Sequence, residues 1–189
     1  SLSEVYVDSV SQLLTALRAK RYCLLGSMYD VVPHTKPLLV SGRATGKEAE
    51  QDLKKAGVQT SNYQGPTTIL NLIAQKAQEV GIETITFIVS LPQYVNVDED
   101  YLGKVRLMEI LNLLYDIPID KKDFEKAARQ RSLISQKVET TPELKKVLSH
   151  LEGIYATRIS KKEGERVIGL SPEMEEIFWE TDEKDVGKE

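Results

Sequence analysis

Cysteine is nearly absent from this sequence. Cys23 is the only cysteine among 189 residues, so no disulfide can form within the chain. Stabilising disulfides belong to oxidising compartments, and their absence here favours the cytoplasm. Residues 1–8 carry two acids and lack the basic region of a signal peptide. We therefore expect a cytoplasmic protein.

Long apolar runs and basic patches with interleaved aromatic residues are also missing. No run approaches the ~20 apolar residues of a membrane helix, so no membrane partner is expected. No stretch combines clustered lysine and arginine with aromatic residues, so no nucleic-acid partner is expected. The composition, 41% apolar and 29% charged, is that of an ordinary globular chain.

The motifs of common catalytic sites are absent too. The chain contains no C-x-x-C, H-E-x-x-H or G-x-S-x-G, which argues against zinc sites and serine nucleophiles. Gly42–Lys47 is close to a phosphate-binding loop, but only three residues separate its glycines. Glu48 also takes the position where that motif needs serine or threonine to hold magnesium. We expect no cofactor and no metal. Whether the protein is an enzyme stays open, although the sequence favours a protein that is not one.

Charge is spread unevenly along the chain. The net charge is −4, but residues 171–189 hold eight acids and two lysines, a net charge of −6, which leaves +2 for the rest. An acidic end of this kind is typical of a solvated extension. The length is near that of one domain with an appendage. We expect a single α/β domain over 1–170, with a helical subregion over 120–153, and an acidic C-terminal helix and tail over 171–189.

Strand patterns and helix patterns alternate along the first two thirds of the chain. This alternation predicts an α/β fold with a largely parallel sheet. Gly42–Gly46 is expected to be a turn, and Gly153 to end the last helix of the domain. The predicted strands cover 4–7, 22–26, 38–41 and 84–90, and the predicted helices cover 10–21, 47–56, 66–80, 101–115, 120–131 and 140–153.

Polar side chains gather in the segment after the second predicted strand. An acid, an imidazole, a hydroxyl and an amine lie within seven residues, in a segment stiffened by two prolines. Ligands of open α/β sheets bind beyond the carboxyl ends of strands, and a helix start offers free N–H groups to an anion. The alternative to a ligand site is that this segment forms a rigid surface turn or a subunit contact. The candidate pocket comprises Tyr29, Asp30, His34, Thr35, Lys36, Gly65, Thr67 and Tyr94.

An apolar cluster lies within the acidic C-terminal segment. Met174, Ile177 and Phe178 share one face of a predicted helix, and Trp179 lies beside them. Amphipathic helices of this kind bind grooves on partner proteins. These four residues are therefore a candidate anchor for a partner helix or a neighbouring subunit.

Three segments resemble one known family. Leu24–Asp30 continues into Val32-Pro33-His34-Thr35-Lys36-Pro37. Together they resemble the L-G-x-M-Y-D and V-P-H-T-R-P stretches of the proteasome assembly chaperone family, in its second-chaperone branch, with lysine in place of arginine. Tyr63–Thr67 resembles the family's Y-x-G-P-T helix start, and Ser90–Val95 resembles its P-x-Y turn. The resemblance covers about Tyr22 to Ala128 and is that of a prokaryotic or archaeal member.

The resemblance implies a fold and a mode of action. It implies a three-layer α/β/α domain with a mostly parallel sheet, similar to the purine nucleoside phosphorylase fold, and self-association into a homo-oligomer. Eukaryotic relatives escort proteasome α subunits during ring assembly, and the family assigns no catalytic residue. The chain departs from the family by ending in Val186–Glu189 rather than hydrophobic–tyrosine–any residue. It also begins later than is usual, which leaves open whether N-terminal strands are missing.

Two hypotheses follow. The leading one is an oligomeric scaffold or chaperone-like binding protein, with proteasome α subunits or another protein as its partner. The alternative is a binding protein, or an enzyme of unknown reaction, for a small anionic ligand such as phosphate or carboxylate, with its pocket around His34.

Overall fold

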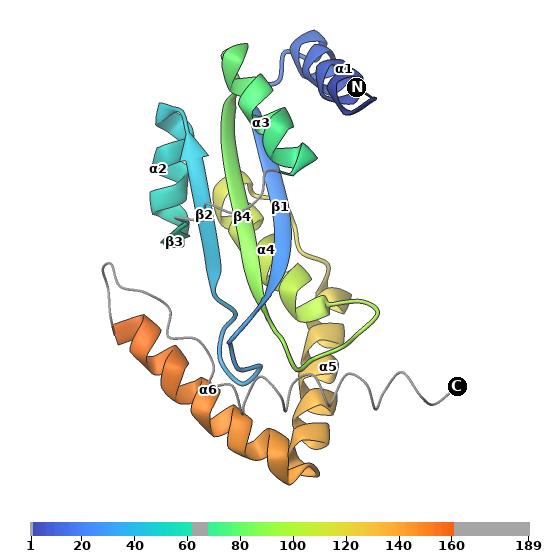
Figure 1. Cartoon of the computed structure of the whole chain (residues 1–189), viewed down its shortest axis with the longest axis vertical. Helices are drawn as coiled ribbons and strands as arrows, with labels where there is room; N and C mark the ends of the chain where they lie inside the picture. Colours follow the sequence, from blue (N-terminus) through green and yellow to red (C-terminus); the bar gives the residue numbers. More distant parts are fainter. Residues whose placement is uncertain (1, 62–67, 161–189) are drawn as a thin grey trace. The chain divides into compact units, whose positions relative to one another are not determined.

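The computed structural model describes residues 2–61 and 68–160, which form six helices and four strands (Figure 1). Gly65, Thr67 and the predicted C-terminal helix with its cluster Met174, Ile177, Phe178 and Trp179 lie outside the described residues. In chain order the elements are α1 (Leu2–Ala16), β1 (Arg21–Asp30), β2 (Val40–Thr45), α2 (Lys47–Ala56), β3 (Gln59–Thr60), α3 (Ile69–Glu79), β4 (Glu83–Pro92), α4 (Tyr101–Tyr115), α5 (Lys121–Glu139) and α6 (Pro142–Ser160).

Two compact units divide the chain, and several elements contribute to both. β1, β4 and α4 each begin in one unit and end in the other. Unit 1 comprises Ser1–Gly26, Val40–Val89 and Glu109–Ile117, and unit 2 comprises Ser27–Leu39, Ser90–Met108 and Pro118–Glu189.

The strands form one mixed sheet in the order β1-β4-β2-β3. β2 pairs antiparallel with β4, from Val40 opposite Val89 to Thr45 opposite Thr84, and β3 pairs parallel with β2. β1 and β4 run in the same direction (Figure 1), and at their start the Glu83 amide donates to the Lys20 carbonyl at 3.2 Å. Two of the three pairings are therefore parallel, and the predicted α/β fold with a mostly parallel sheet is confirmed.

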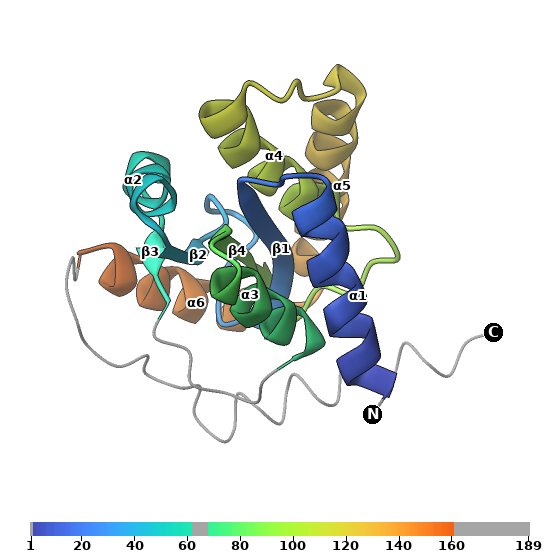
Figure 2. The same cartoon turned by 90° about the horizontal axis from the view of Figure 1, so that it is seen from above.

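The core of unit 1 centres on β4. Ile85 and Phe87 have no exposed surface and Val89 is 1% exposed, as the alternation of a strand under a helix layer requires. Helix α1 packs against α3, and α2 packs against β2. Figure 2 shows helices on both sides of this sheet, with α1 and α3 together on one side and α4 on the other.

Unit 2 is built around two long helices that pack against each other, α5 and α6. Asp120 begins α5 as an N-cap, because its side chain accepts a hydrogen bond from the Lys122 amide at 2.9 Å. Helix α6 buries Val147 and Leu151, and Val31 and Tyr94 pack against that pair. The segment that follows β1 therefore lies against the C-terminal helices.

Several predicted elements were wrong or misplaced. Residues 4–7 belong to helix α1 rather than a strand, because Val7 and Ser11 continue the buried side at helical spacing. Residues 42–45 are strand rather than turn, because pairing with β4 overrides the low strand preference of Gly42. Gly153 lies inside α6 and does not end it.

Helix α2 was predicted with its observed ends. Gly57 follows it in the left-handed conformation, with φ 63°, and its amide donates to the Lys54 carbonyl. Strand β1 continues to Asp30, so residues 27–30, which the sequence predicts as loop, are strand.

Candidate functional site

The segment between β1 and β2 carries a fully buried histidine. His34 has no exposed surface. Its backbone amide donates to the Tyr94 hydroxyl at 2.8 Å, and its Nδ1 lies 2.6 Å from the same oxygen. Its Nε2 lies 3.0 Å from Ser135 Oγ on α5. Both ring nitrogens therefore have protein partners, and the imidazole joins the loop after β1 to the loop after β4 and to α5.

Burial decides the protonation of this group. Burial lowers the pKa of His34 below its ordinary value, and the positive charge of Arg131 acts in the same direction. Burial raises the pKa of the Tyr94 hydroxyl to about 12. At pH 7 the imidazole is neutral and the phenol keeps its proton. The pair is an uncharged hydrogen-bonded joint, with the two rings edge to face at 5.8 Å.

One side of α6 holds the same segment at three points. The Thr35 hydroxyl donates to Glu152 Oε1 at 2.5 Å. One turn further on, the Tyr155 hydroxyl donates to the Pro37 carbonyl at 2.9 Å. These side chains are three residues apart, so they share one side of the helix. Both contacts lie in the C-terminal half of α6.

The third point is an ion pair with two hydrogen bonds. Arg158 Nη1 donates to Asp30 Oδ2 at 2.9 Å, and Nη2 donates to Oδ1 at 3.1 Å. Burial alone would raise the pKa of the Asp30 carboxyl, but the hydrogen bonds and charge of Arg158 outweigh it and lower that pKa. Paired hydrogen bonds of this kind are stronger and more directional than a single contact. The carboxylate at the end of β1 is thus fixed to the last turns of α6.

The structure brings together some of the predicted pocket residues. Asp30, His34, Thr35 and Tyr94 all contribute to this clamped loop. Tyr29 is 60% exposed, and Lys36 is exposed beside the loop. The predicted contribution of Gly65 and Thr67 lies outside the described residues.

Sequence reasoning missed the partners on the C-terminal helices. They are Ser135, Glu152, Tyr155 and Arg158. The signal that could have revealed three of them is their spacing of three residues, which continues the helix past Gly153. Gly153 conceals this continuation, because glycine commonly ends a helix.

A second polar cluster lies in unit 1, around Arg21 at the start of β1. Arg21 pairs with Asp52 and Glu83 and donates to the Tyr115 hydroxyl at 3.0 Å. Glu83 in turn accepts hydrogen bonds from the Glu48 and Ala49 amides, both at 3.0 Å. The hydrogen bond from Arg21 lowers the pKa of Glu83. The start of α2, where a phosphate-binding loop would place its phosphate, therefore holds a carboxylate of the chain itself.

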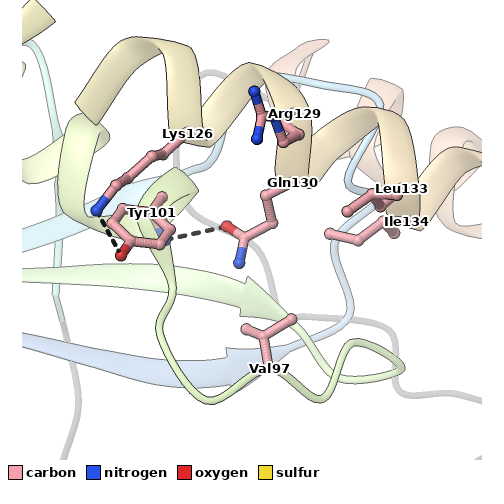
Figure 3. A pocket seen from close by; sticks show the side chains of 7 residues that line it. All are labelled: Val97, Tyr101, Lys126, Arg129, Gln130, Leu133 and Ile134. Carbon is pink, nitrogen blue, oxygen red and sulfur yellow. Dashed lines mark hydrogen bonds between the residues drawn. The ribbon is translucent and has the colours of Figure 1, made fainter. Parts of the chain in front are cut away.

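A groove of about 330 Å³ lies between α5 and the start of α4 in unit 2 (Figure 3). Gln130 Oε1 accepts hydrogen bonds from the Tyr101 and Leu102 amides, at 3.0 and 3.2 Å, and so caps α4. The Lys126 ammonium lies 4.6 Å from the centre of the Tyr101 ring. The lining residues are Val97, Tyr101, Lys126, Arg129, Gln130, Leu133 and Ile134.

Within 2–61 and 68–160, no three histidine, cysteine or acidic side chains are placed to hold a metal ion together. No helix in these ranges has the length and apolar character of a membrane span.

The chain matches the model of the PAC2 family over residues 2–139. It therefore belongs to the PAC2 family. No curated protein gives a significant match.

Solved structures share its fold. A protein of unknown function from Corynebacterium glutamicum matches with TM-score 0.76 and 15% identity, over 85% of this chain and 59% of that one. A proteasome-assembly chaperone homologue from Mycobacterium tuberculosis matches with TM-score 0.66 and 21% identity, over 78% and 62%. An archaeal homologue of proteasome-assembly chaperone from Pyrococcus furiosus matches with TM-score 0.56 and 16% identity, over 83% and 63%. The present chain thus spans 59–63% of the length of these three structures.

Proposed function

We propose that the protein is a chaperone-like binding protein that forms a homo-oligomeric scaffold and binds proteasome α subunits or a related partner in the cytoplasm. Membership of the PAC2 family supports a chaperone-like role. Similarity in fold to two structures named as homologues of proteasome-assembly chaperones supports the choice of partner. The single cysteine supports the cytoplasmic location.

The observation that carries the proposal is an exposed apolar face on α1. Leu2, Tyr6 and Leu13 lie on one side of this helix at helical spacing and are 88%, 53% and 57% exposed. Val5 widens the face and is 64% exposed. Soluble monomers rarely leave a large contiguous apolar patch open to water, and such patches mark interaction sites. The helix therefore presents a surface suited to protein binding.

A second copy of this chain is the proposed occupant of the α1 face. Most soluble homo-oligomers are symmetric dimers in which the same patch meets itself. Helix α1 carries Glu4 and Asp8 and no lysine or arginine, so two copies would pack by apolar contact and not by ion pairs.

Native mass spectrometry tests this proposal. The purified protein is measured alone and mixed with proteasome α subunits from the same source. A homo-oligomer that forms a defined complex with the α subunits is expected. Leu13→Asp should reduce the homo-oligomer to monomer, because a buried carboxylate costs more than the contact contributes.

Thr15→Glu is the matched control, because Thr15 is exposed on the opposite side of the same helix from Leu2, Tyr6 and Leu13. It adds a negative charge without removing an apolar side chain, so the oligomer should survive. A wild-type protein that stays monomeric and ignores α subunits would contradict the proposal.

The geometry gives less support to a small anionic ligand near His34. The ring is fully buried, and both of its nitrogens contact Tyr94 or Ser135. The amine of Lys36 remains exposed. Thermal unfolding measured with a panel of anionic metabolites tests the hypothesis of a small anionic ligand, and stabilisation by one of them would support it.

A further inference from the structure

We propose that the groove between α4 and α5 binds the chain's own C-terminal segment, Met174–Trp179, within the same molecule. This inference is independent of the function proposed above. It rests on the chemistry of the groove, on the charge of the segment and on the length of chain that joins them.

The groove is apolar at its floor and cationic at its rim. Val97, Leu133 and Ile134 line it with aliphatic carbon, and Leu133 is 60% exposed. Figure 3 shows the side chains of Leu133 and Ile134 together on α5, with Val97 on the loop across from them. Exposure of the Leu133 side chain to water is unfavourable, and an apolar side chain that covers it would remove this cost.

Two cations of α5 border this hollow. Lys126 donates to the Tyr101 hydroxyl at 3.0 Å, and Glu99 lies beside the same hydroxyl, so this ammonium is already engaged. Arg129 also lines the groove, and within the described ranges it forms no ion pair or hydrogen bond. The rim thus offers one uncommitted guanidinium, which carboxylates bind with two parallel hydrogen bonds.

The C-terminal segment has the complementary composition. Met174, Ile177 and Phe178 recur at helical spacing, and Trp179 adjoins them. Acids surround this apolar set at Glu173, Glu175, Glu176 and Glu180. An apolar stripe flanked by acids fits an apolar groove flanked by cations.

The connecting chain is long enough to reach. The 13 residues 161–173 separate Ser160 from Met174, and they can span roughly 45 Å. Helix α6 has 19 residues, about 28 Å. The path back along α6 and the end of α5 to Ile134 is about 40 Å. The segment can therefore return to the groove of its own molecule.

Trp179 is the only tryptophan among the 189 residues, so selectively excited tryptophan emission reports on this segment alone. Docking predicts an emission maximum at shorter wavelength than free tryptophan and weak quenching by acrylamide. Leu133→Asp and Arg129→Glu should each move the emission to longer wavelength and strengthen the quenching. Leu113→Asp, at a leucine near the end of α4 that is 49% exposed and does not line the groove, is the matched control and should leave both unchanged.

A competition experiment with a synthetic peptide tests the proposal even if a groove variant fails to fold. A synthetic peptide of residues 171–189 carrying Trp179→Phe is silent and, in excess, should displace Trp179 of the wild-type protein and shift its emission to longer wavelength. The same peptide with Ile177→Ser and Phe178→Ser should not. Wild-type emission like that of free tryptophan, unchanged by peptide and by groove variants, would overturn the proposal.

Dilution separates the intramolecular form from exchange between copies. The emission of a segment docked in its own molecule does not change on dilution. A blue-shifted emission that is lost on dilution would place the segment of a second copy in the groove and would overturn the intramolecular assignment. Because Leu13→Asp affects assembly and Leu133→Asp affects emission, failure of either proposal is visible without the other.

Discussion

Gly46 lies directly against the side chain of Glu83. A Cβ atom on Gly46 would overlap the Cγ of Glu83, and Gly46 has φ 112°, a conformation that residues with side chains rarely adopt. Its position immediately before α2 lets the Glu83 carboxylate reach the first amides of that helix. The negative carboxylate there stabilises the positive end of the helix dipole.

Gly46→Ala should destabilise the protein. The methyl group meets both the unfavourable φ and the Glu83 side chain, so we expect a loss of about 1–3 kcal/mol in the free energy of unfolding. Gly153→Ala is the contrast, because Gly153 lies in α6 with open space around it. Alanine there should stabilise by up to about 1 kcal/mol. Urea denaturation measures both, and equal effects of the two changes would refute the argument.

His34 should make stability depend on pH. Its pKa in the folded protein is below the ordinary value of about 6.5. Between those two values the unfolded chain binds more protons than the folded chain, so stability falls as the pH is lowered from about 6.5 through the lower folded value. His34→Gln removes the titrating group and should flatten this slope.

His150 supplies the control for this measurement. It is the only other histidine and is exposed on α6. His150→Gln should keep the wild-type dependence of unfolding free energy on pH. If the slope is lost in His150→Gln and kept in His34→Gln, the assignment to the buried ring is wrong.

The ion pair of Asp30 and Arg158 should contribute more to the free energy of unfolding than an exposed ion pair does. The side chains are 22% and 15% exposed. Arg158→Met leaves the carboxylate without its partner, and we expect a loss of about 2 kcal/mol in unfolding free energy. Lys145→Met breaks the exposed pair with Glu139, whose side chains are 50% and 65% exposed, and should cost less than about 1 kcal/mol.

A double-mutant cycle isolates the pair itself. Asp30→Asn, Arg158→Met and their combination should give a coupling of at least about 0.5 kcal/mol. Because the pKa of Asp30 is lowered, this contribution is present above about pH 4 and disappears as the pH falls through the lower folded value. Strict additivity of the two changes at pH 7 would mean that the contact contributes nothing.

Local signals were sufficient for part of the fold. Helix α2 was predicted correctly because a polar helical stretch meets Gly57, whose left-handed conformation is a local property. The nearness of His34 and Tyr94 follows from a simple rule, since parallel strands end at the same edge of a sheet. Asp30, at the end of β1, accepts a hydrogen bond from the Gln93 amide just past β4.

Other features depend on contacts that leave no local trace. Gly42 belongs to a strand only because β4 lies beside it. Arg158 lies in a basic stretch that gives no hint of a partner 128 residues earlier in the chain. The sequence offers Glu48 as an argument against a phosphate site, but the contact of Glu83 with that helix start could not be deduced, since 35 residues separate Glu48 from Glu83.

The clamp on the loop after β1 has a consequence for synthesis of the chain. Asp30 leaves the ribosome long before Arg158, and Thr35 long before Glu152, which is 117 residues away. Unit 2 draws on three separate stretches of the sequence, so it cannot be completed until α6 has emerged. Until then the segment around His34 stays unclosed, and its apolar neighbours are open to misassociation. A nascent chain arrested before residue 158 should therefore be protease-sensitive at this segment, because α6 is the helix that secures the loop after β1.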